Sequence, residues 1–212
     1  DSATTSVTIK PFPGFKPVLT MGIATEFDAA MFRIHDGSLR FEEMEFRLAP
    51  SRPEFRSQTV ASLLGDGNCT FRNCLATLDS AGDTSLWLVQ LADNSGVMKM
   101  PQSGSQVQTP KIVVVDSLIR GYGTLLQINV SRPCEFKLEN SIVALSGSLT
   151  HIEGNPKESM SRIGLELTLE KATIAITENL LQLKGLKSDN RSHKGLGLTN
   201  VKYVRDSMIV PM

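Results

Sequence analysis

Two aspartates, Asp36 and Asp66, have the spacing that most suggests chemistry. Each is followed by glycine, and the segments around them match at a shift of 30 residues. If these segments lie side by side in a parallel sheet, their backbones are about 4.8 Å apart. Two stacked carboxylates could bind Ca²⁺, or could serve as the acid and the nucleophile of a retaining glycosidase, which stand about 5 to 5.5 Å apart. Asp-Gly is also a common turn signal, so a pair of structural turns is the favoured interpretation.

Arg40, Arg72 and Trp87 are the other candidate ligand-binding residues. The two arginines could meet an acidic sugar, but their separation of 32 residues offsets them by one residue pair from the 30-residue register. A pair of solvated arginines is the simpler interpretation. Trp87 precedes a loop at 92–110 that is rich in Ser, Gly, Gln and Asn, and ligand sites often lie on such loops. A tolerated surface insertion with Trp87 half buried is the favoured alternative.

The sequence contains no recognisable catalytic or metal-binding motif. No Gly-x-Ser-x-Gly nucleophile elbow is present, and Gly121-Tyr122-Gly123 lacks the next glycine of a dinucleotide fingerprint. The three histidines are scattered, and His151 falls in an outward polar row with Gln127. Three cysteines do not form a disulfide framework, and Cys69 and Cys74 are expected to be small buried hydrophobic residues. We therefore predict no catalytic residue, no metal site and no cofactor, with Ca²⁺ at the aspartates left open.

Charge and hydropathy exclude two classes of protein. The 22 basic and 22 acidic residues cancel, and neither sign forms a run. A nucleic-acid-binding protein normally carries a basic stripe, so nucleic acid is not an expected partner. No apolar run approaches the roughly 20 residues that a membrane-spanning helix requires, and we expect no such segment.

A short repeat supplies the elements that would position the candidate residues. Each copy alternates apolar and polar residues, then has a polar pair, then alternates again, which is strand patterning with a bend in the middle. Successive copies start 30, 43, 24 and 31 residues apart. Stacking such copies would pair each strand with its equivalent in the next copy and would bury a continuous core. The five copies begin at Leu39, Cys69, Ile112, Phe136 and Leu167.

The bend column of the repeat consists of Glu43, Asn73, Asp116, Asn140 and Lys171. Asn and Asp tolerate left-handed backbone geometry, which suits a tight bend. At these residues the chain resembles the right-handed parallel β-helix, or pectate-lyase-like, superfamily, in which an asparagine-rich ladder commonly occupies one bend. The resemblance covers roughly residues 32–183. The lyases of that family use acidic Ca²⁺ ligands with a basic residue, and its hydrolases use clustered Asp residues, but neither set matches positions in this sequence.

The predicted fold is all-β: a right-handed parallel β-helix, or solenoid, of about five short coils with terminal caps. Phe12 and Phe15 are expected to help cover the N-terminal end of the core. The predicted organisation is an N-terminal cap and incomplete first coil at 1–31, repeats at 32–183 with insertions at 49–60, 92–110 and 153–162, and a C-terminal cap or linker at 184–212.

The favoured function is a non-catalytic scaffold or binding module, for protein or carbohydrate, within a larger protein. This hypothesis depends on the missing catalytic cluster and on outward positions that are apolar, namely Val113, Val115, Leu118 and Ile142. The alternative is a polysaccharide lyase or glycoside hydrolase acting on an acidic glycan. The expected partners are other domains of the parent protein, a separate protein or a glycan. The family resemblance implies a secreted or cell-surface bacterial protein.

Overall fold

The computed structural model describes nine segments of the 212-residue chain. They are residues 5–22, 26–50, 55–80, 82–92, 109–129, 133–153, 164–184, 201–203 and 206–211. All regular structure in these segments is β-strand, and no helix that could cross a membrane occurs in them. Of the insertions predicted at 92–110 and 153–162, residues 93–108 and 154–162 lie outside the described residues. The segment predicted as an insertion at 49–60 runs into a strand at Ser57.

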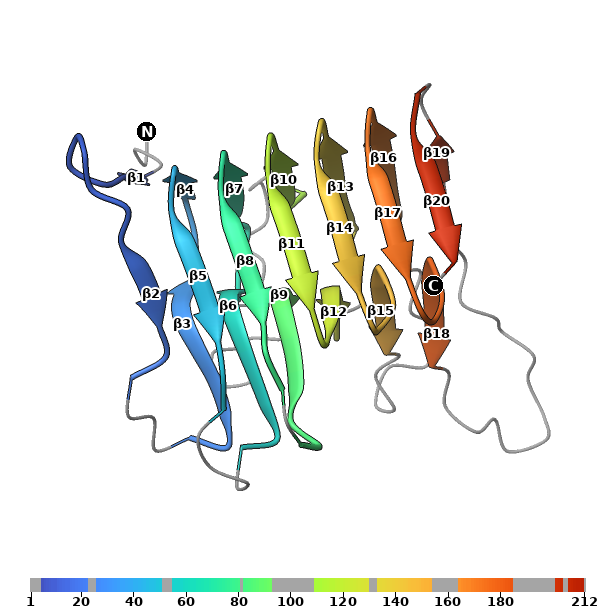
Figure 1. Cartoon of the computed structure of the whole chain (residues 1–212), viewed down its shortest axis with the longest axis horizontal. Helices are drawn as coiled ribbons and strands as arrows, with labels where there is room; N and C mark the ends of the chain where they lie inside the picture. The colour runs from blue at the N-terminus through green and yellow to red at the C-terminus, as the bar shows by residue number, and fades with distance from the viewer. Residues whose placement is uncertain are drawn as a thin grey trace, which may run out of the picture.

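The strands form three sheets in which every pair is parallel, and the chain visits sheets A, B and C in turn (Figure 1). Sheet A contains β1 (Ser6–Ile9), β4 (Ser38–Glu42), β7 (Asn68–Arg72), β10 (Lys111–Val115), β13 (Cys134–Glu139), β16 (Leu165–Glu170) and β19 (Val201–Tyr203). Sheet B contains β2 (Val18–Thr20), β5 (Glu45–Leu48), β8 (Leu75–Leu78), β11 (Leu118–Gly121), β14 (Ile142–Leu145), β17 (Thr173–Ile176) and β20 (Met208–Pro211). Sheet C contains β3 (Asp28–Ile34), β6 (Ser57–Leu63), β9 (Ser85–Leu91), β12 (Thr124–Ile128), β15 (Thr150–Glu153) and β18 (Leu181–Lys184).

The predicted repeat register is confirmed in sheet A. The partners there run Leu39, Cys69, Ile112, Phe136 and Leu167, one from each predicted copy. The sheets also extend beyond these copies. Strands β1 and β2 pair with β4 and β5 at one end, and β19 and β20 pair with β16 and β17 at the other. This all-β arrangement of stacked parallel strands is consistent with a parallel β-helix.

The bend between sheets A and B is made by the predicted column. All five members have left-handed backbones, with φ between 44° and 56°, and Asp206 continues the column with φ 69°. Each coil donates backbone hydrogen bonds across this bend to the next coil, as when Asn140 N–H bonds Glu170 O at 2.9 Å. The Asn140 side chain also donates to Asp116 Oδ1 at 2.7 Å. Even Glu43 and Lys171 adopt the strained geometry, so the bend is set by the repeat and not by residue type alone.

Buried serines line the inner side of the same bend. The Ser117 hydroxyl accepts a hydrogen bond from Cys74 N–H at 3.0 Å and donates to Val115 O at 2.7 Å. One coil later, Ser141 accepts from Ser117 N–H at 3.0 Å. These hydroxyls accept hydrogen bonds from backbone N–H groups that, at the tight bend, have no partner in the hydrogen-bond ladders between strands.

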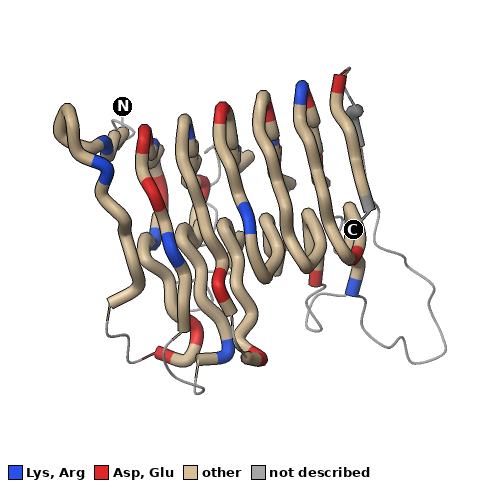
Figure 2. The backbone as a smooth tube through the Cα atoms, in the orientation of Figure 1, with Lys and Arg blue, Asp and Glu red and all other residues tan. Residues whose placement is uncertain are grey.

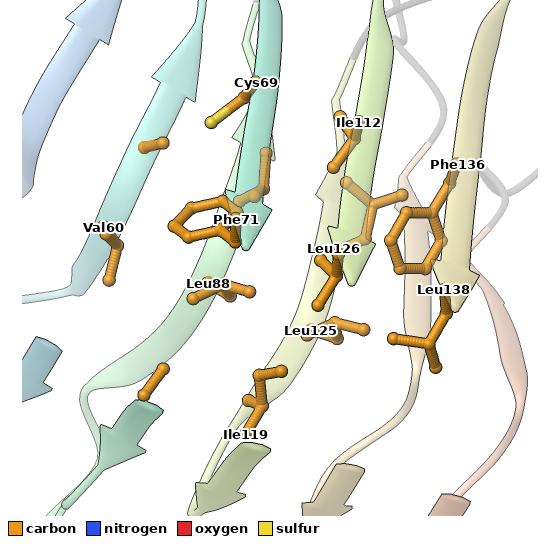
Figure 3. Packing of buried hydrophobic residues seen from close by; sticks show 14 of the residues in the cluster. Val60, Cys69, Phe71, Leu88, Ile112, Ile119, Leu125, Leu126, Phe136 and Leu138 are labelled. Carbon is orange, nitrogen blue, oxygen red and sulfur yellow. The ribbon is translucent and has the colours of Figure 1, made fainter. Parts of the chain in front are cut away.

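The core consists of the inward columns of the three sheets (Figure 3). A cluster of phenylalanines fills the N-terminal coils, with Phe41 stacked on Phe71 at 5.1 Å between ring centroids and on Phe46 edge-on at 5.0 Å. Cys69 and Cys74 are buried free thiols, as predicted, and desolvation raises the pKa of both.

The predicted cover at the N-terminal end of the core is wrong. Phe12 and Phe15 contact each other in an edge-on pair, with ring centroids 6.0 Å apart, and both are largely exposed. The loop that carries them turns at Gly14, which has φ 86°. This loop lies at the bend between β1 and β2 (Figure 1).

Candidate functional site

Asp36 and Asp66 lie together, at the turns that lead from sheet C into sheet A. The Asp66 N–H points to Asp36 Oδ1 at 3.4 Å, so one carboxylate accepts from the backbone of the next turn. Gly65 also packs against these turns, because an added Cβ would meet His35 O at 1.7 Å. The contact observed between Asp36 and Asp66 is therefore a hydrogen bond from the backbone of one turn to the side chain of the neighbouring turn. Among the described residues no group of three or more His, Cys, Asp or Glu side chains is placed to hold a metal ion.

Arg40 and Arg72 lie on the outer side of sheet A, in different rows. Arg40 is level with Thr70, and Arg72 is level with Glu42, which is the offset expected from the sequence. Arg40 forms an ion pair with Glu42 at 2.6 Å, and Arg72 forms one with Asp116 at 3.5 Å. Both cations therefore already have carboxylate partners in the fold.

The predicted residues do not form a single cluster. Asp66 precedes β7 and Arg72 ends it, so the strand separates them by roughly 15 to 20 Å at about 3.3 Å per residue. Trp87 belongs to sheet C, level with Thr59 and Thr124. An open hollow of about 400 Å³ lies on the bend between sheets A and B, and it is lined by Glu42, Glu43, Arg72, Asn73 and Asp116.

The outer face of sheet A is covered by ion pairs. Lys111 pairs with Glu135 at 3.6 Å. Lys137 lies between Glu139, at 2.7 Å, and Glu170, at 3.3 Å. The hydrogen bond to Glu139 is the main reason that the pKa of Lys137 is raised. Two of these contacts link neighbouring strands, and most charges on the outer face of sheet A are paired.

The outer face of sheet B is different over its C-terminal half. Its outward rows there carry no charge, and Figure 2 shows the tube through β14 and β17 without a charged residue. Ile142 is 51% exposed and Met208 is 56% exposed. We call this surface the apolar face; it consists of Ile142, Ala144, Thr173, Ala175, Met208 and Val210.

An arginine borders the apolar face. Arg120 lies in the outward row of Ala144, one strand away, and its Nε donates to Thr77 Oγ1 at 3.3 Å. Among the described residues no carboxylate lies within ion-pair distance of its guanidinium, in contrast to Arg47 in the same row, which pairs with Asp79 at 2.9 Å. The apolar face thus has an exposed cation at its edge.

Sequence reasoning found part of this surface and missed the rest. Leu118 and Ile142 were recognised as outward apolar residues, and the register confirms that they share a row with Leu75. The continuation to Met208 and Val210 was missed, because β20 follows residues 185–200 and has no recognisable copy of the repeat before it. On sheet A, Val115 was predicted to be an outward apolar residue. It is buried and is therefore not accessible to a partner.

The outer face of sheet C has a polar row, as predicted. Gln127, His151 and Gln182 are level with one another. Gln127 is buried although it points outward, and its Oε1 has no hydrogen-bond partner among the described residues. Burial lowers the pKa of His151, and nearby Lys184 lowers it further. Glu153 and Glu178 act in the opposite direction and offset only part of this effect.

Comparison with known proteins gives no relative. No protein-family model, no curated protein and no solved structure matches the chain.

Proposed function

We propose that the chain is a non-catalytic binding module whose apolar face holds a protein segment within a larger assembly. The scaffold is a right-handed parallel β-helix of the pectate-lyase-like kind. Support for the scaffold comes from the three stacked parallel sheets and from the left-handed column at one bend, in which Asn and Asp predominate. Crossover connections between parallel strands are right-handed in nearly all proteins.

The observation that carries the proposal is the uncharged patch on sheet B, in contrast to the ion pairs on the outer face of sheet A. Aliphatic side chains that stay exposed on a regular sheet cost free energy unless a partner covers them. Ile142 and Met208 are both more than half exposed, in a row where Leu118 is half-buried. Apolar residues such as these, with Met among them, are typical of the centre of a protein interface.

The chemistry of the face indicates the kind of partner. Apart from Thr173, its members are aliphatic residues and one Met, and the single tryptophan of the chain, Trp87, belongs to another sheet. Arg120 borders the face and has no carboxylate partner among the described residues. A partner segment that fits therefore carries apolar side chains and, beside them, an aspartate or glutamate that pairs with Arg120.

Selection from a random peptide library displayed on phage tests this proposal. We expect the selected peptides to combine apolar residues with an acidic residue, and to bind the chain with a dissociation constant in the micromolar range. Ile142→Glu should abolish binding, whereas Thr168→Glu, at an outward position of sheet A, should leave it unchanged. Arg120→Glu should weaken the acidic peptides and favour basic ones. Peptides that bind the Ile142→Glu variant as well as the wild type would contradict the proposal.

The second candidate function is a polysaccharide lyase or hydrolase acting on an acidic glycan. The contact between Asp36 and Asp66 and the hollow beside Arg72 are the features that favour it. A thermal-shift screen with Ca²⁺ and acidic oligosaccharides tests it, because a ligand that binds only the folded chain raises its melting temperature. A shift that is lost in Asp66→Ala or Arg72→Ala would favour this function over the protein-binding one.

A further inference from the structure

The connection between β1 and β2 is a loop, whereas the next coil makes the same connection with a short bend (Figure 1). The ends of the loop, Ile9 and Val18, are level with Phe41 and Glu45. Three residues lie between the latter pair, but eight, residues 10–17, lie between the former. None of these eight belongs to a strand. We call residues 10–17 the Phe loop; the repeat itself does not account for its extra length.

A tight turn fixes the tip of the Phe loop. Phe15 N–H donates to Phe12 O at 3.0 Å, and Pro13 and Gly14 occupy the two central positions. Gly14 has φ 86°, and proline followed by a residue with this geometry defines a type II turn. Pro11 restricts the backbone just before the turn. The tip is therefore preorganised, and little conformational entropy is lost when it binds a partner.

The turn presents two phenylalanine rings to solvent. Phe12 is 76% exposed and Phe15 is 67% exposed, the highest values of any large hydrophobic residue in the described structure. Their rings contact each other edge-on. Two aromatic side chains bury roughly 300 to 500 Å² together, which is less than the ~800 Å² that each partner of a stable protein complex buries. The pair is too small for such an interface, but it suits a shallow apolar layer.

A lysine lies at each end of the Phe loop. Lys10 and Lys16 are both exposed, and neither has an ion-pair partner in the part of the chain that the structure describes. The loop contains no aspartate or glutamate. Aromatic rings suit the boundary between the headgroups and the acyl chains of a bilayer, and lysines beside them suit anionic headgroups. The composition and the exposure of the loop thus match a lipid surface.

From these observations we infer that the Phe loop attaches the chain to the surface of an anionic lipid bilayer. Phe12 and Phe15 insert to the boundary between headgroups and acyl chains, while Lys10 and Lys16 bind lipid phosphates. Two rings and two lysines give weak, reversible attachment. The Phe loop shares no residue with the apolar face of sheet B, so the inference does not depend on the peptide-binding proposal.

Co-sedimentation of the 212-residue chain with vesicles of phosphatidylcholine and phosphatidylglycerol tests the inference. The wild type should bind, and Phe12→Ser combined with Phe15→Ser should weaken binding by at least about tenfold for each ring. Phe27→Ser is the matched control, because Phe27 is also exposed but precedes β3, and it should bind like the wild type. A wild type that does not bind these vesicles, or a double variant that binds equally well, would overturn the inference.

Charge substitutions test the part played by the lysines. Lys10→Gln combined with Lys16→Gln should weaken binding by about fivefold for each lysine. Lys111→Gln combined with Lys171→Gln changes the net charge equally, at positions outside the loop, and should have a smaller effect. Equal losses in the two double variants would assign the attraction to net charge and would contradict the contact between the loop and lipid phosphates.

Electrostatics also sets the expected preference between lipids. Glu43 is exposed on the neighbouring bend and should offset about one of the two lysines. The wild type should therefore bind vesicles that contain phosphatidylglycerol about fivefold more tightly than vesicles of phosphatidylcholine alone. Equal or weaker binding to the anionic vesicles would contradict the inferred lipid class.

Tryptophan fluorescence shows whether the tip enters the bilayer. Phe12→Trp combined with Trp87→Phe leaves the single tryptophan of the chain at the tip of the Phe loop. Its emission should move to shorter wavelength on vesicles, and lipids brominated on their acyl chains should quench it. Phe27→Trp in the same Trp87→Phe chain is the control and should show neither change. Vesicle binding without quenching at the tip would show attachment through another surface and would overturn the inference.

The same vesicles separate this inference from the peptide-binding proposal. Ile142→Glu, which should abolish peptide binding, should leave vesicle binding unchanged. Phe12→Ser combined with Phe15→Ser should leave peptide binding unchanged. Loss of vesicle binding in a folded Ile142→Glu chain, with folding checked by circular dichroism, would place the lipid contact on sheet B and would overturn the inference.

Discussion

The outer faces of sheets A and B are built on one repeat, yet they differ in what their outward residues do. On sheet A, Lys137 bridges Glu139 and Glu170, and most charges of the face are paired with one another. On sheet B, Ile142 and Met208 occupy the outward row of the C-terminal coils without any charged neighbour in that row between them. The strands on both faces have the same alternation and the same stacking. The outward side chains are therefore free to vary while the fold is kept.

This difference separates stability from function within each strand. Inward residues are buried in the interior coils, whereas the outward residue beside each one contacts mainly solvent or its stacked neighbours. A substitution should consequently affect either unfolding or binding according to the direction in which the side chain points. The following predictions, from the largest expected effect to the smallest, test that separation.

Adjacent residues of β11 give the strongest test. Ile119 is fully buried and Leu118 is half-buried on the outer side. Ile119→Ala should lower the free energy of unfolding by about 2 to 5 kcal/mol, because it leaves a cavity in the core. Leu118→Ala should lower it by roughly 1 kcal/mol or less and should weaken binding of peptides to the apolar face. Equal losses of stability, measured by urea denaturation, would show that the two sides are not distinct.

The bend that joins the two faces should be the next most sensitive place. Ser117→Ala removes the acceptor of the buried Cys74 N–H, for which no other partner is seen in the described structure. A buried donor left unpaired costs about 1 to 3 kcal/mol, and urea denaturation should show a loss of that size. Ser117→Thr keeps the hydroxyl and should lose less. If both variants lose the same amount, the hydroxyl is not what stabilises the bend.

The left-handed column offers a stabilising substitution. Lys171 has φ 50°, a geometry that costs a non-glycine residue about 1 to 2 kcal/mol. Lys171→Gly relieves this strain and should raise the free energy of unfolding by about 0.5 to 1 kcal/mol after the entropy cost of glycine. Thr173→Gly, in the extended strand that follows, is the matched control and should lower stability. A loss of stability in both variants would indicate that Lys171 is not strained.

The face of sheet C should give the smallest effect, visible only as a dependence on pH. Burial lowers the pKa of His151 in the folded chain, so the unfolded chain takes up its proton at a higher pH. Stability is therefore fully present above the unfolded pKa, near 6.5, and falls as pH drops from there toward the folded pKa. His151→Gln, which resembles its row neighbours Gln127 and Gln182, should flatten this part of the melting-temperature profile. An unchanged profile would assign the pH dependence to other groups.

The sequence was sufficient to predict the repeat, the parallel stacking and the bend column. Alternation with a fixed polar pair survives in each copy because inward positions and the left-handed position are physically constrained. Glu43 and Lys171 show the strength of this constraint, since both were assigned to the bend by position and not by residue type. Phe12 and Phe15 were assigned wrongly, because hydrophobicity alone does not show whether a ring reaches the core.

The candidate site was harder to predict, because it depends on outward residues that no periodic constraint identifies. Arg72 looks like a possible ligand contact in the sequence, but the register places Asp116 beside it. The ends of the apolar face, Met208 and Val210, become neighbours of Ile142 and Ala144 only through Thr173 and Ala175 of β17. These contacts can be predicted only if β20 is known to pair with β17. The sequence around β20 contains no recognisable copy of the repeat, so it does not indicate this pairing.

Methyl-resolved NMR during titration with a library-selected peptide tests the central claim most directly. The account predicts that the methyl signals of Ile142 and Met208, both exposed on sheet B, shift or broaden with the first additions. The signals of Val113, which lies on the outer side of sheet A, should stay in place. Shifts centred on Val113, or none at Ile142 and Met208 despite binding, would show that the partner segment binds elsewhere and would contradict the account.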